Sequence, residues 1–170
     1  MLIDDLSIAH PLASNGARWQ LFTDQVMGGI SQGTAVREII AGRAAIRLRG
    51  NVSLENNGGF VQIGLDLAPD GACVDASLFD GVELDVRGNG DYYGVHLRTD
   101  AVTRPWQSYR QTFVTTEEWQ TVRLPFVRFE PHRIASPLDT QHLRRIGIVA
   151  IGRAFTADVA LARLAFYRRA

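Results

Sequence analysis

The stretch Thr34–Arg49, TAVREIIAGRAAIRLR, predicts the fold of this chain. Two runs, residues 34–40 and 44–49, flank the turn-forming sequence Ala41-Gly42-Arg43. In the second run Ala44, Ile46 and Leu48 alternate with polar or small neighbours. A period of two is typical of a strand with one buried and one exposed face, so the stretch predicts a β-hairpin.

Similar alternation recurs along most of the chain, and no segment shows a sustained helical period. About ten short strands, separated by turns every 8–12 residues, are typical of an all-β sandwich of the jelly-roll kind with little helix. We expect an irregular lead-in over residues 1–18, a single sandwich domain over 19–170, one helical turn at 75–79, an edge segment at 125–129 and a long loop at 130–142. The remaining predicted strands cover residues 18–22, 60–67, 82–87, 92–98, 106–114, 119–124, 146–151 and 159–166.

The predicted hairpin lies between two loops that each contain a glycine pair. Asp24–Gly33 precedes it, with Gly28 and Gly29 adjacent, and Glu55–Phe60 follows it. Glycine adopts positive φ without steric cost and leaves backbone amides uncovered. Each loop therefore either turns tightly or lets another group approach its backbone.

The second loop contains the sequence Asn56-Asn57-Gly58-Gly59. Both loops combine short side-chain acceptors with uncovered amides. We therefore expect them to meet, with Asp24 and Asn56 or Asn57 accepting hydrogen bonds from amides of the opposite loop.

The composition is that of a soluble globular protein. The 170 residues are 46% hydrophobic and 21% charged, and 18 acidic residues balance 18 basic ones, all of them arginine. The absence of a basic excess argues against nucleic acid as a partner. The absence of lysine excludes Schiff-base chemistry on a lysine side chain.

The single cysteine, Cys73, cannot form an internal disulfide or a zinc cluster, and no His or Arg flanks it. The acidic start, Met1–Asp5, has the features of neither a secretory signal nor a transit peptide. Because 18 consecutive apolar residues occur nowhere, no transmembrane segment is expected. These features predict a cytoplasmic protein.

Signatures of catalysis are weak. Neither glycine loop continues into Gly-Lys-Ser/Thr or a helix, so neither is a phosphate-binding loop. The four histidines are scattered, and His96, on a predicted strand, is more typical of a structural residue. Ser31 or Ser53 could act as a nucleophile only beside a base and an orienting group. The Asn and Asp residues of the loops are more typical of Asx-turns than of a calcium site. We predict no catalytic residue, metal or cofactor.

A binding surface has better support. Arg98, Trp106 and Tyr109 lie on consecutive predicted strands or at their rims, together with Tyr93, Arg104, Arg110 and Trp119. Aromatic rings and guanidinium groups suit sugar rings or an acidic protein surface. The same aromatic residues could instead belong to the sandwich core, with the arginines solvated.

Several motifs together point to one family. The first two are Trp19…Asp24-x-Val26-Met27-Gly28-Gly29-x-Ser31 and Gly50…Leu54-x-Asn56-Asn57-Gly58-Gly59-Phe60. Later landmarks are Asp80-Gly81, Gly88-Asn89-Gly90-x-Tyr92, Tyr109, Trp119, Leu124-Pro125-Phe126 and Phe155. From about Trp19 to the C-terminus, the chain resembles the thirty-kilodalton complex I intermediate-associated protein family.

This resemblance implies a galactose-binding-domain-like β-sandwich. It also implies a non-catalytic, chaperone-like role in assembling respiratory NADH:ubiquinone oxidoreductase (complex I), with complex I subunits or assembly intermediates as partners. The chain departs from mitochondrial members in lacking an N-terminal extension, and so looks like a short bacterial relative. It also has Asn89 where the family usually has an acidic residue.

Two main functions therefore stand side by side, with an unrecognised enzyme as a third. The first is a binding or assembly protein. The second is a small-ligand module for carbohydrate, with aromatic stacking on the Trp106–Tyr109 strand. The candidate binding residues are Asp24, Met27, Gly28, Gly29, Ser31, Asn56, Asn57, Gly58, Gly59, Arg98, Trp106 and Tyr109.

Overall fold

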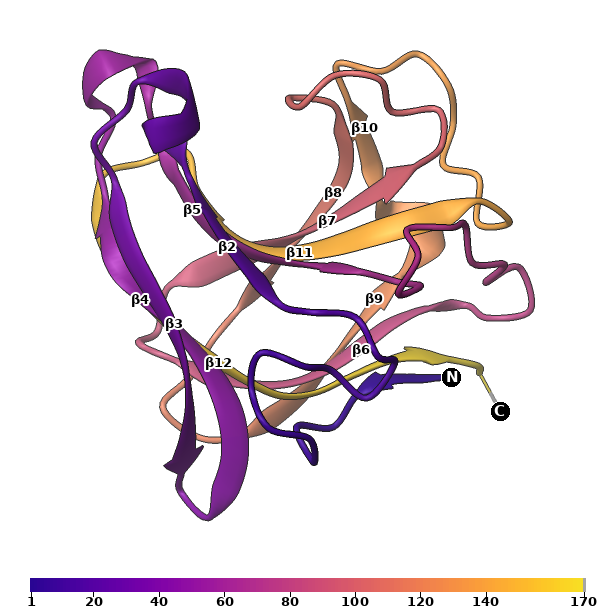
Figure 1. Cartoon of the computed structure of the whole chain (residues 1–170), viewed down its shortest axis with the longest axis horizontal. Helices are drawn as coiled ribbons and strands as arrows, with labels where there is room; N and C mark the ends of the chain where they lie inside the picture. Colours follow the sequence, from indigo (N-terminus) through magenta and orange to yellow (C-terminus); the bar gives the residue numbers. More distant parts are fainter. Residues whose placement is uncertain (170) are drawn as a thin grey trace.

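The computed structural model describes residues 1–169 and consists of two antiparallel β-sheets packed face to face (Figure 1). The first sheet has the order β3 (Gln32–Ile40), β4 (Arg43–Val52), β12 (Phe155–Tyr167), β6 (Gly81–Gly88) and β9 (Gln120–Pro125), with β1 (Leu2–Asp4) also pairing with β12. The second has the order β10 (Glu130–His132), β8 (Ser108–Val114), β7 (Tyr92–Thr99), β11 (Leu143–Ile151), β5 (Phe60–Asp66) and β2 (Gln20–Thr23).

Three short 3₁₀ helices complete the described structure: η1 (Asp24–Met27), η2 (Glu55–Asn57) and η3 (Phe126–Arg128). The predicted all-β sandwich with little helix is confirmed. Within residues 1–169, no helix is both long and apolar enough to cross a lipid bilayer.

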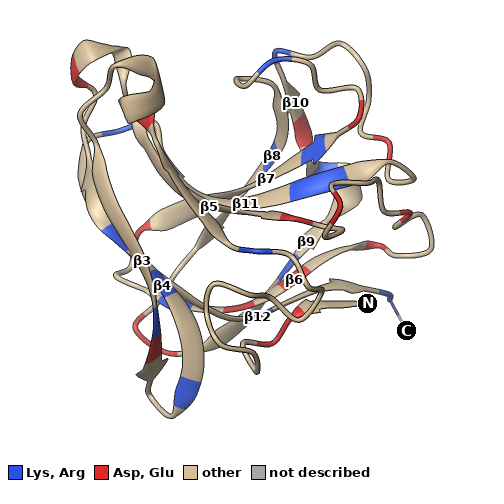
Figure 2. Cartoon of the chain, viewed as in Figure 1, with Lys and Arg blue, Asp and Glu red and all other residues tan. Residues whose placement is uncertain are grey.

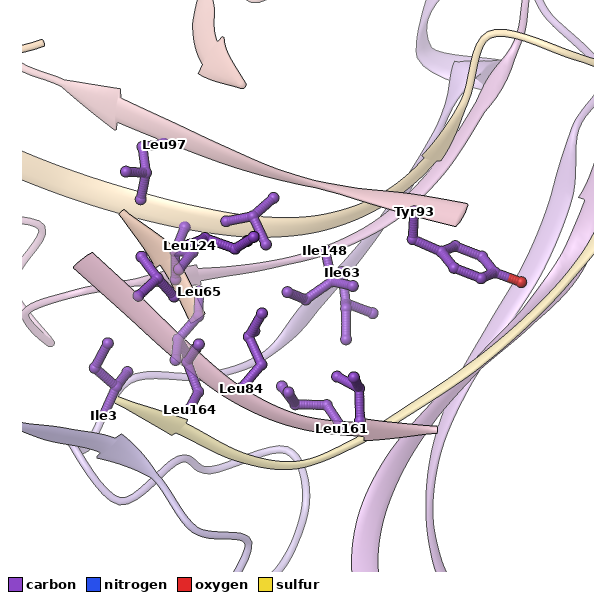
Figure 3. Packing of buried hydrophobic residues seen from close by; sticks show 14 of the residues in the cluster. Ile3, Ile63, Leu65, Leu84, Tyr93, Leu97, Leu124, Ile148, Leu161 and Leu164 are labelled. Atoms are coloured by element: carbon purple, nitrogen blue, oxygen red, sulfur yellow. The ribbon is translucent and has the colours of Figure 1, made fainter. Parts of the chain in front are cut away.

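The core lies between the sheets and follows the predicted alternation. Ile46 and Leu48 of β4 are fully buried, whereas Arg47 between them points outward. Leucine and isoleucine side chains from both sheets meet in this layer, among them Leu84 and Ile63 (Figure 3). Burying these side chains is the main stabilising contribution to such a fold.

The outer face of the first sheet is covered by cross-strand ion pairs. Arg47 lies 2.7 Å from Asp158, and Glu83 accepts hydrogen bonds from Arg123 at 2.7 Å and Arg163 at 2.6 Å. Such pairs are hallmarks of a solvated sheet face, and each contributes little to stability. Most arginines on this face are thus matched by carboxylates.

The N-terminal lead-in differs from the expected irregular segment. Leu2–Asp4 forms strand β1 on β12, and Ile3 and Leu6 are buried in the core. Asp4, fully buried, accepts a hydrogen bond from the indole Nε1 of Trp19 at 2.7 Å. A three-residue strand is too short to show alternation, so the sequence contains no signal for it.

Four local expectations also differ in detail. The predicted helical turn at 75–79 is a non-helical turn, and η3 takes up most of the expected edge segment after Pro125. The long loop at 130–142 begins with strand β10. Trp106 precedes β8 and is not part of that strand.

The second sheet is curved, and raised segments border its outer face (Figure 1). The loops that carry η1 and η2 rise on one side, and β10 with the chain before β8 rises on the other. Strands β5, β11 and β7 form the floor between these two walls.

Candidate functional site

A groove of about 510 Å³ occupies this concave face. Its lining comes from the floor strands β5, β7, β8 and β11 and from both walls. The lining residues are Phe22, Val26, Met27, Phe60, Gln62, Gly64, His96, Arg98, Pro105, Trp106, Gln107, Ser108, Arg110, Arg145, Gly147, Val149 and Ile151.

The strand register places one row of residues across the middle of the floor. Gly147 of β11 pairs with Gly64 of β5 on one side and with His96 of β7 on the other, and His96 pairs with Arg110 of β8. A Cβ atom at Gly147 would come within 2.9 Å of the Gln62 side chain. Because the two glycines have no side chains, they leave space in the groove beside His96.

The next row toward β10 is basic. Arg145 of β11 pairs in register with Arg98 of β7 and with Asp66 of β5. The Arg145 guanidinium lies over the Phe22 ring at 4.7 Å, donates to Gln20 Oε1 at 2.7 Å and approaches the Asp66 carboxylate at 3.3 Å. Arg145 thus has partners within the fold.

Arg98 and Arg110 differ from Arg145. Both are half-buried, and neither lies within ion-pair distance of a carboxylate in residues 1–169. Arg110 Nε donates to Ser108 Oγ at 2.8 Å, and Arg98 Nη2 reaches the Arg104 carbonyl at 3.5 Å. Figure 2 shows basic segments on β7 and β11, on the side of the second sheet toward β10.

The pKa values of these guanidinium groups reflect the missing counter-charge. Desolvation, then repulsion from Arg145 and Arg144, lowers the pKa of Arg98. Desolvation, followed by repulsion from Arg133, lowers the pKa of Arg110. Both side chains remain cationic at neutral pH, because an arginine pKa lies far above 7.

His96 is neutral at the bottom of the groove. Desolvation, with repulsion from Arg110 and His132, lowers its pKa to about 3. Its imidazole makes no hydrogen bond to another side chain in residues 1–169. The positive charge of the floor therefore comes from arginine and does not change between mildly acidic and neutral pH.

The opposite side of the groove is apolar. Phe60 of β5 pairs in register with Ile151 of β11, and the η1 wall above them carries Val26 and Met27, which are 76% and 54% exposed. Trp106, 50% exposed, stands on the other wall. The groove is consequently apolar toward η1 and cationic toward β10.

Asp24 fixes the η1 wall in place. Its fully buried carboxylate accepts hydrogen bonds from the amides of Ser31 at 2.9 Å, Gly59 at 2.6 Å and Phe60 at 3.2 Å, and from the Ser31 hydroxyl. Ser31 Oγ in turn accepts from the Ser53 amide at 2.9 Å. The two glycine loops are thereby joined, as the sequence predicts.

Burial opposes ionisation of Asp24, but the hydrogen bonds from the Ser31 hydroxyl and the three amides outweigh it and lower its pKa. Glycine is required around this carboxylate for steric reasons. A Cβ atom at Gly29 would collide with the Asp24 side chain, and one at Gly58 would come within 2.5 Å of its Oδ2.

The predicted binding residues fall into separate groups. Met27, Arg98 and Trp106, far apart in sequence, line the same groove. Asp24 and Ser31 are buried and do not line the groove, so they can position its η1 wall but cannot touch a partner.

In the glycine loops, Gly28 and Gly59 adopt positive φ angles that shape the backbone of the wall. Gly28 has φ of 86° and Gly59 of 142°. Asn56 and Asn57 are exposed, with φ of 56° and 59°, and within residues 1–169 their side chains make no hydrogen bond to the first loop. The expectation that one of them would share the role of Asp24 was wrong.

Tyr109 does not belong to the groove. It is fully buried, and its hydroxyl lies 2.8 Å from the Ser136 carbonyl. Tyr93 is also buried, and Trp119 donates to the Ile40 carbonyl at 3.0 Å on the first sheet. The aromatic stacking surface expected between Trp106 and Tyr109 is therefore absent, and Trp106 remains as the exposed aromatic residue of that set.

Comparison with known families gives a match over residues 10–160 to the model described as "Complex I intermediate-associated protein 30 (CIA30)". The chain belongs to this family. The matched region contains η1, η2 and all the lining residues of the groove. A comparison with curated proteins finds no significant match.

Solved structures place this member of the CIA30 family among jelly-roll domains. It is similar to a family 11 carbohydrate-binding module from Clostridium thermocellum, solved with a β-1,3-1,4-mixed-linked tetrasaccharide, with a TM-score of 0.72 and 11% identity over 98% of this chain and 94% of that one. A family 30 carbohydrate-binding module gives a TM-score of 0.61 with 16% identity over 81% and 76%. An exo-β-agarase gives 0.64 with 9% identity over 99% of this chain and 25% of the enzyme. At these identities the likeness establishes the fold.

Proposed function

We propose that this protein is a non-catalytic, chaperone-like binding protein of the cytoplasm that holds a protein partner in the groove during assembly of NADH:ubiquinone oxidoreductase. Membership of the CIA30 family supports the choice of partner, which would be a complex I subunit or an assembly intermediate.

The groove itself carries this proposal. Met27 and Trp106 stand half exposed on opposite walls above a floor that contains Arg98. Tryptophan and arginine provide much of the binding energy at protein interfaces, and methionine adapts to irregular apolar surfaces. An exposed apolar surface rimmed by polar groups is typical of a protein interaction site.

The side chains of the groove are better suited to binding a partner than to catalysing a reaction. A general base at neutral pH needs a pKa near 7, whereas burial takes the pKa of His96 to about 3. Ser108 of the lining accepts from Arg110, a guanidinium that cannot act as a base. These groups can orient a bound segment by hydrogen bonds and charge.

Carbohydrate is the second candidate. The modules similar in fold are described as carbohydrate-binding, and Trp106 offers an exposed ring on the groove wall for stacking on a sugar. An unpaired arginine can also donate hydrogen bonds to hydroxyl groups.

The two candidates differ in what deletion of the gene would do. In cells that make complex I, we expect deletion to lower the amount of assembled complex on native gels while its subunits are still synthesised. Expression of the double variant Trp106→Ala/Arg98→Ala in the deletion strain should fail to restore assembly, although the variant protein is expected to fold. Normal assembly in the deletion strain would reject this role and favour the carbohydrate candidate, which binding of the purified protein to mixed-linked glucan would then test.

A further inference from the structure

Starting from the proposed function, we infer that the partner segment is acidic and amphipathic: it presents a carboxylate to Arg98 and Arg110 and apolar side chains to Met27 and its neighbours on the η1 wall. The occupant is thus a polypeptide segment in which Asp or Glu residues lie opposite an apolar edge.

Arg98 and Arg110 differ from most of the other half-buried arginines of this protein. Most of those have carboxylates: Arg43 lies 2.8 Å from Asp85, and Arg153 lies 2.6 Å from Asp91, whereas Arg87 on the first sheet is an exception. Arg98 and Arg110 are also half-buried but have no carboxylate within ion-pair distance in residues 1–169. Taking a cation partly out of water without a counter-charge is costly, so the groove favours an anionic occupant.

The two arginines lie close together on adjacent strands. Arg110 pairs in register with His96, and Arg98 lies two residues after His96 on the same face of β7. Arg98 and Arg110 are therefore diagonal neighbours on adjacent strands, within reach of one carboxylate between them. The lining adds Arg145 and contains no acidic residue. A carboxylate would accept charge-assisted hydrogen bonds there and offset the desolvation and the repulsion that lower both arginine pKa values.

The opposite side of the groove offers apolar side chains to the occupant. Val26 and Met27 expose flexible or branched aliphatic groups above Phe60 and Ile151. Such groups complement aliphatic side chains better than the hydroxyl-covered edge of a sugar ring. An acidic polypeptide with an apolar edge satisfies both sides of the groove, whereas an acidic polysaccharide satisfies only the cationic side.

Peptide binding by the whole protein tests this inference. The probes are overlapping peptides that tile the subunits of NADH:ubiquinone oxidoreductase, each with blocked ends. Each peptide is also made with every Asp and Glu replaced by Asn and Gln. Dissociation constants are measured by fluorescence polarisation for wild type, for Arg98→Gln/Arg110→Gln and for Arg87→Gln.

Arg87→Gln is a matched control. Arg87 is also half-buried and without a carboxylate within ion-pair distance in the described chain, but it lies on β6 of the other sheet. The control removes a similar charge from a different surface. Thermal melting of all three proteins checks that each is folded.

We expect wild type to prefer acidic peptides over their amide forms by about 10-fold or more, because hydrogen bonds between charged groups are the strong ones. The double variant should lose this preference, Arg87→Gln should keep it, and added salt should weaken it. Binding without a preference for acidic residues, or a preference that survives in the double variant, overturns the inference and leaves the proposed function standing. If no peptide binds but an acidic oligosaccharide such as oligogalacturonate does, both the inference and the proposed protein partner are wrong.

Discussion

The carboxylate of Asp24 accepts a hydrogen bond from the backbone amide of Gly59 at 2.6 Å, although 35 residues separate them in the chain. This contact joins the loop before the β3–β4 hairpin to the loop after it. It also fixes the start of η1, three residues before Met27 on the groove wall. A buried structural carboxylate thereby positions an exposed contact residue.

Asp24→Ala should destabilise the protein by about 2–3 kcal/mol, because amides of Ser31, Gly59 and Phe60 would lose their buried acceptor. Urea unfolding measures the effect. Asp70→Ala is the matched control, since Asp70 caps a single amide, that of Ala72, in an exposed turn. Equal stability of the two variants would mean that Asp24 does not hold the loops together.

Alanine substitutions should distinguish a glycine that is needed for space, Gly29, from one that is needed for its positive φ, Gly28. Gly29→Ala should cost more than Gly28→Ala, because the added Cβ at Gly29 collides with Asp24, whereas at Gly28 it meets no atom within 4 Å. Gly28→Ala should cost about 1 kcal/mol, the strain of its positive φ. Gly42→Ala at the hairpin tip, with φ of 81° and open space, is the control for Gly28. Equal melting temperatures for the Gly29 and Gly28 variants would contradict the steric argument.

Stability should depend on pH through His96. Its pKa is about 3 in the folded protein and 6.5 in the unfolded chain, so between these values the unfolded chain binds a proton that the folded protein does not. Stability therefore rises with pH across this window and falls on acidification, by at most about 1.4 kcal/mol per pH unit.

The variant His96→Gln removes the imidazole that takes up this proton in the unfolded chain. Its free energy of unfolding should consequently fall less than that of wild type between pH 6.5 and pH 5, a range above the titration of most carboxylates. Parallel pH profiles for the two proteins would show that His96 is not desolvated in solution.

Two single substitutions on the walls test the groove without changing its charge. Met27→Ala and Trp106→Ala should each weaken binding of acidic, apolar peptides by about 1–2 kcal/mol and leave the melting temperature within error, because both side chains are at least half exposed. Val127→Ala is the control, since Val127 is 90% exposed on η3 and lies outside the groove. Val127→Ala should bind as wild type does, and a loss equal to that of Trp106→Ala would place the binding surface elsewhere.

Much of the fold could be predicted from the sequence because alternation is a local property. Ile46 and Leu48 face the core, as their spacing predicts, and the strands that line the groove all lie near their expected positions. The three-residue strands β1 and β10 could not be found, since pairing with a neighbouring strand creates them and three residues contain no period.

The candidate site could be predicted in part. The chemistry of Met27, Arg98 and Trp106 indicates binding residues, and the curvature of the second sheet brings them to one groove. The aromatic character of Tyr109 also suggests a binding residue, although Tyr109 is adjacent to Arg110 in β8 and therefore lies on the opposite face of that strand. Its partner Leu97 is buried, whereas Arg110 pairs with His96 in the groove. The alternation of β8 alone therefore places Arg110, and not Tyr109, among the candidate binding residues.

Site-specific photo-crosslinking in cells that make complex I tests the central claim most directly. A photo-crosslinking amino acid is placed at position 106 on the groove wall or at position 127 on η3, and adducts are identified by mass spectrometry. We predict adducts between position 106 and subunits or assembly intermediates of complex I, lost when Arg98 and Arg110 are replaced by Gln, and none from position 127. Absence of a complex I adduct at position 106, or equal adducts from both positions, would contradict the assignment of the groove as the partner-binding site.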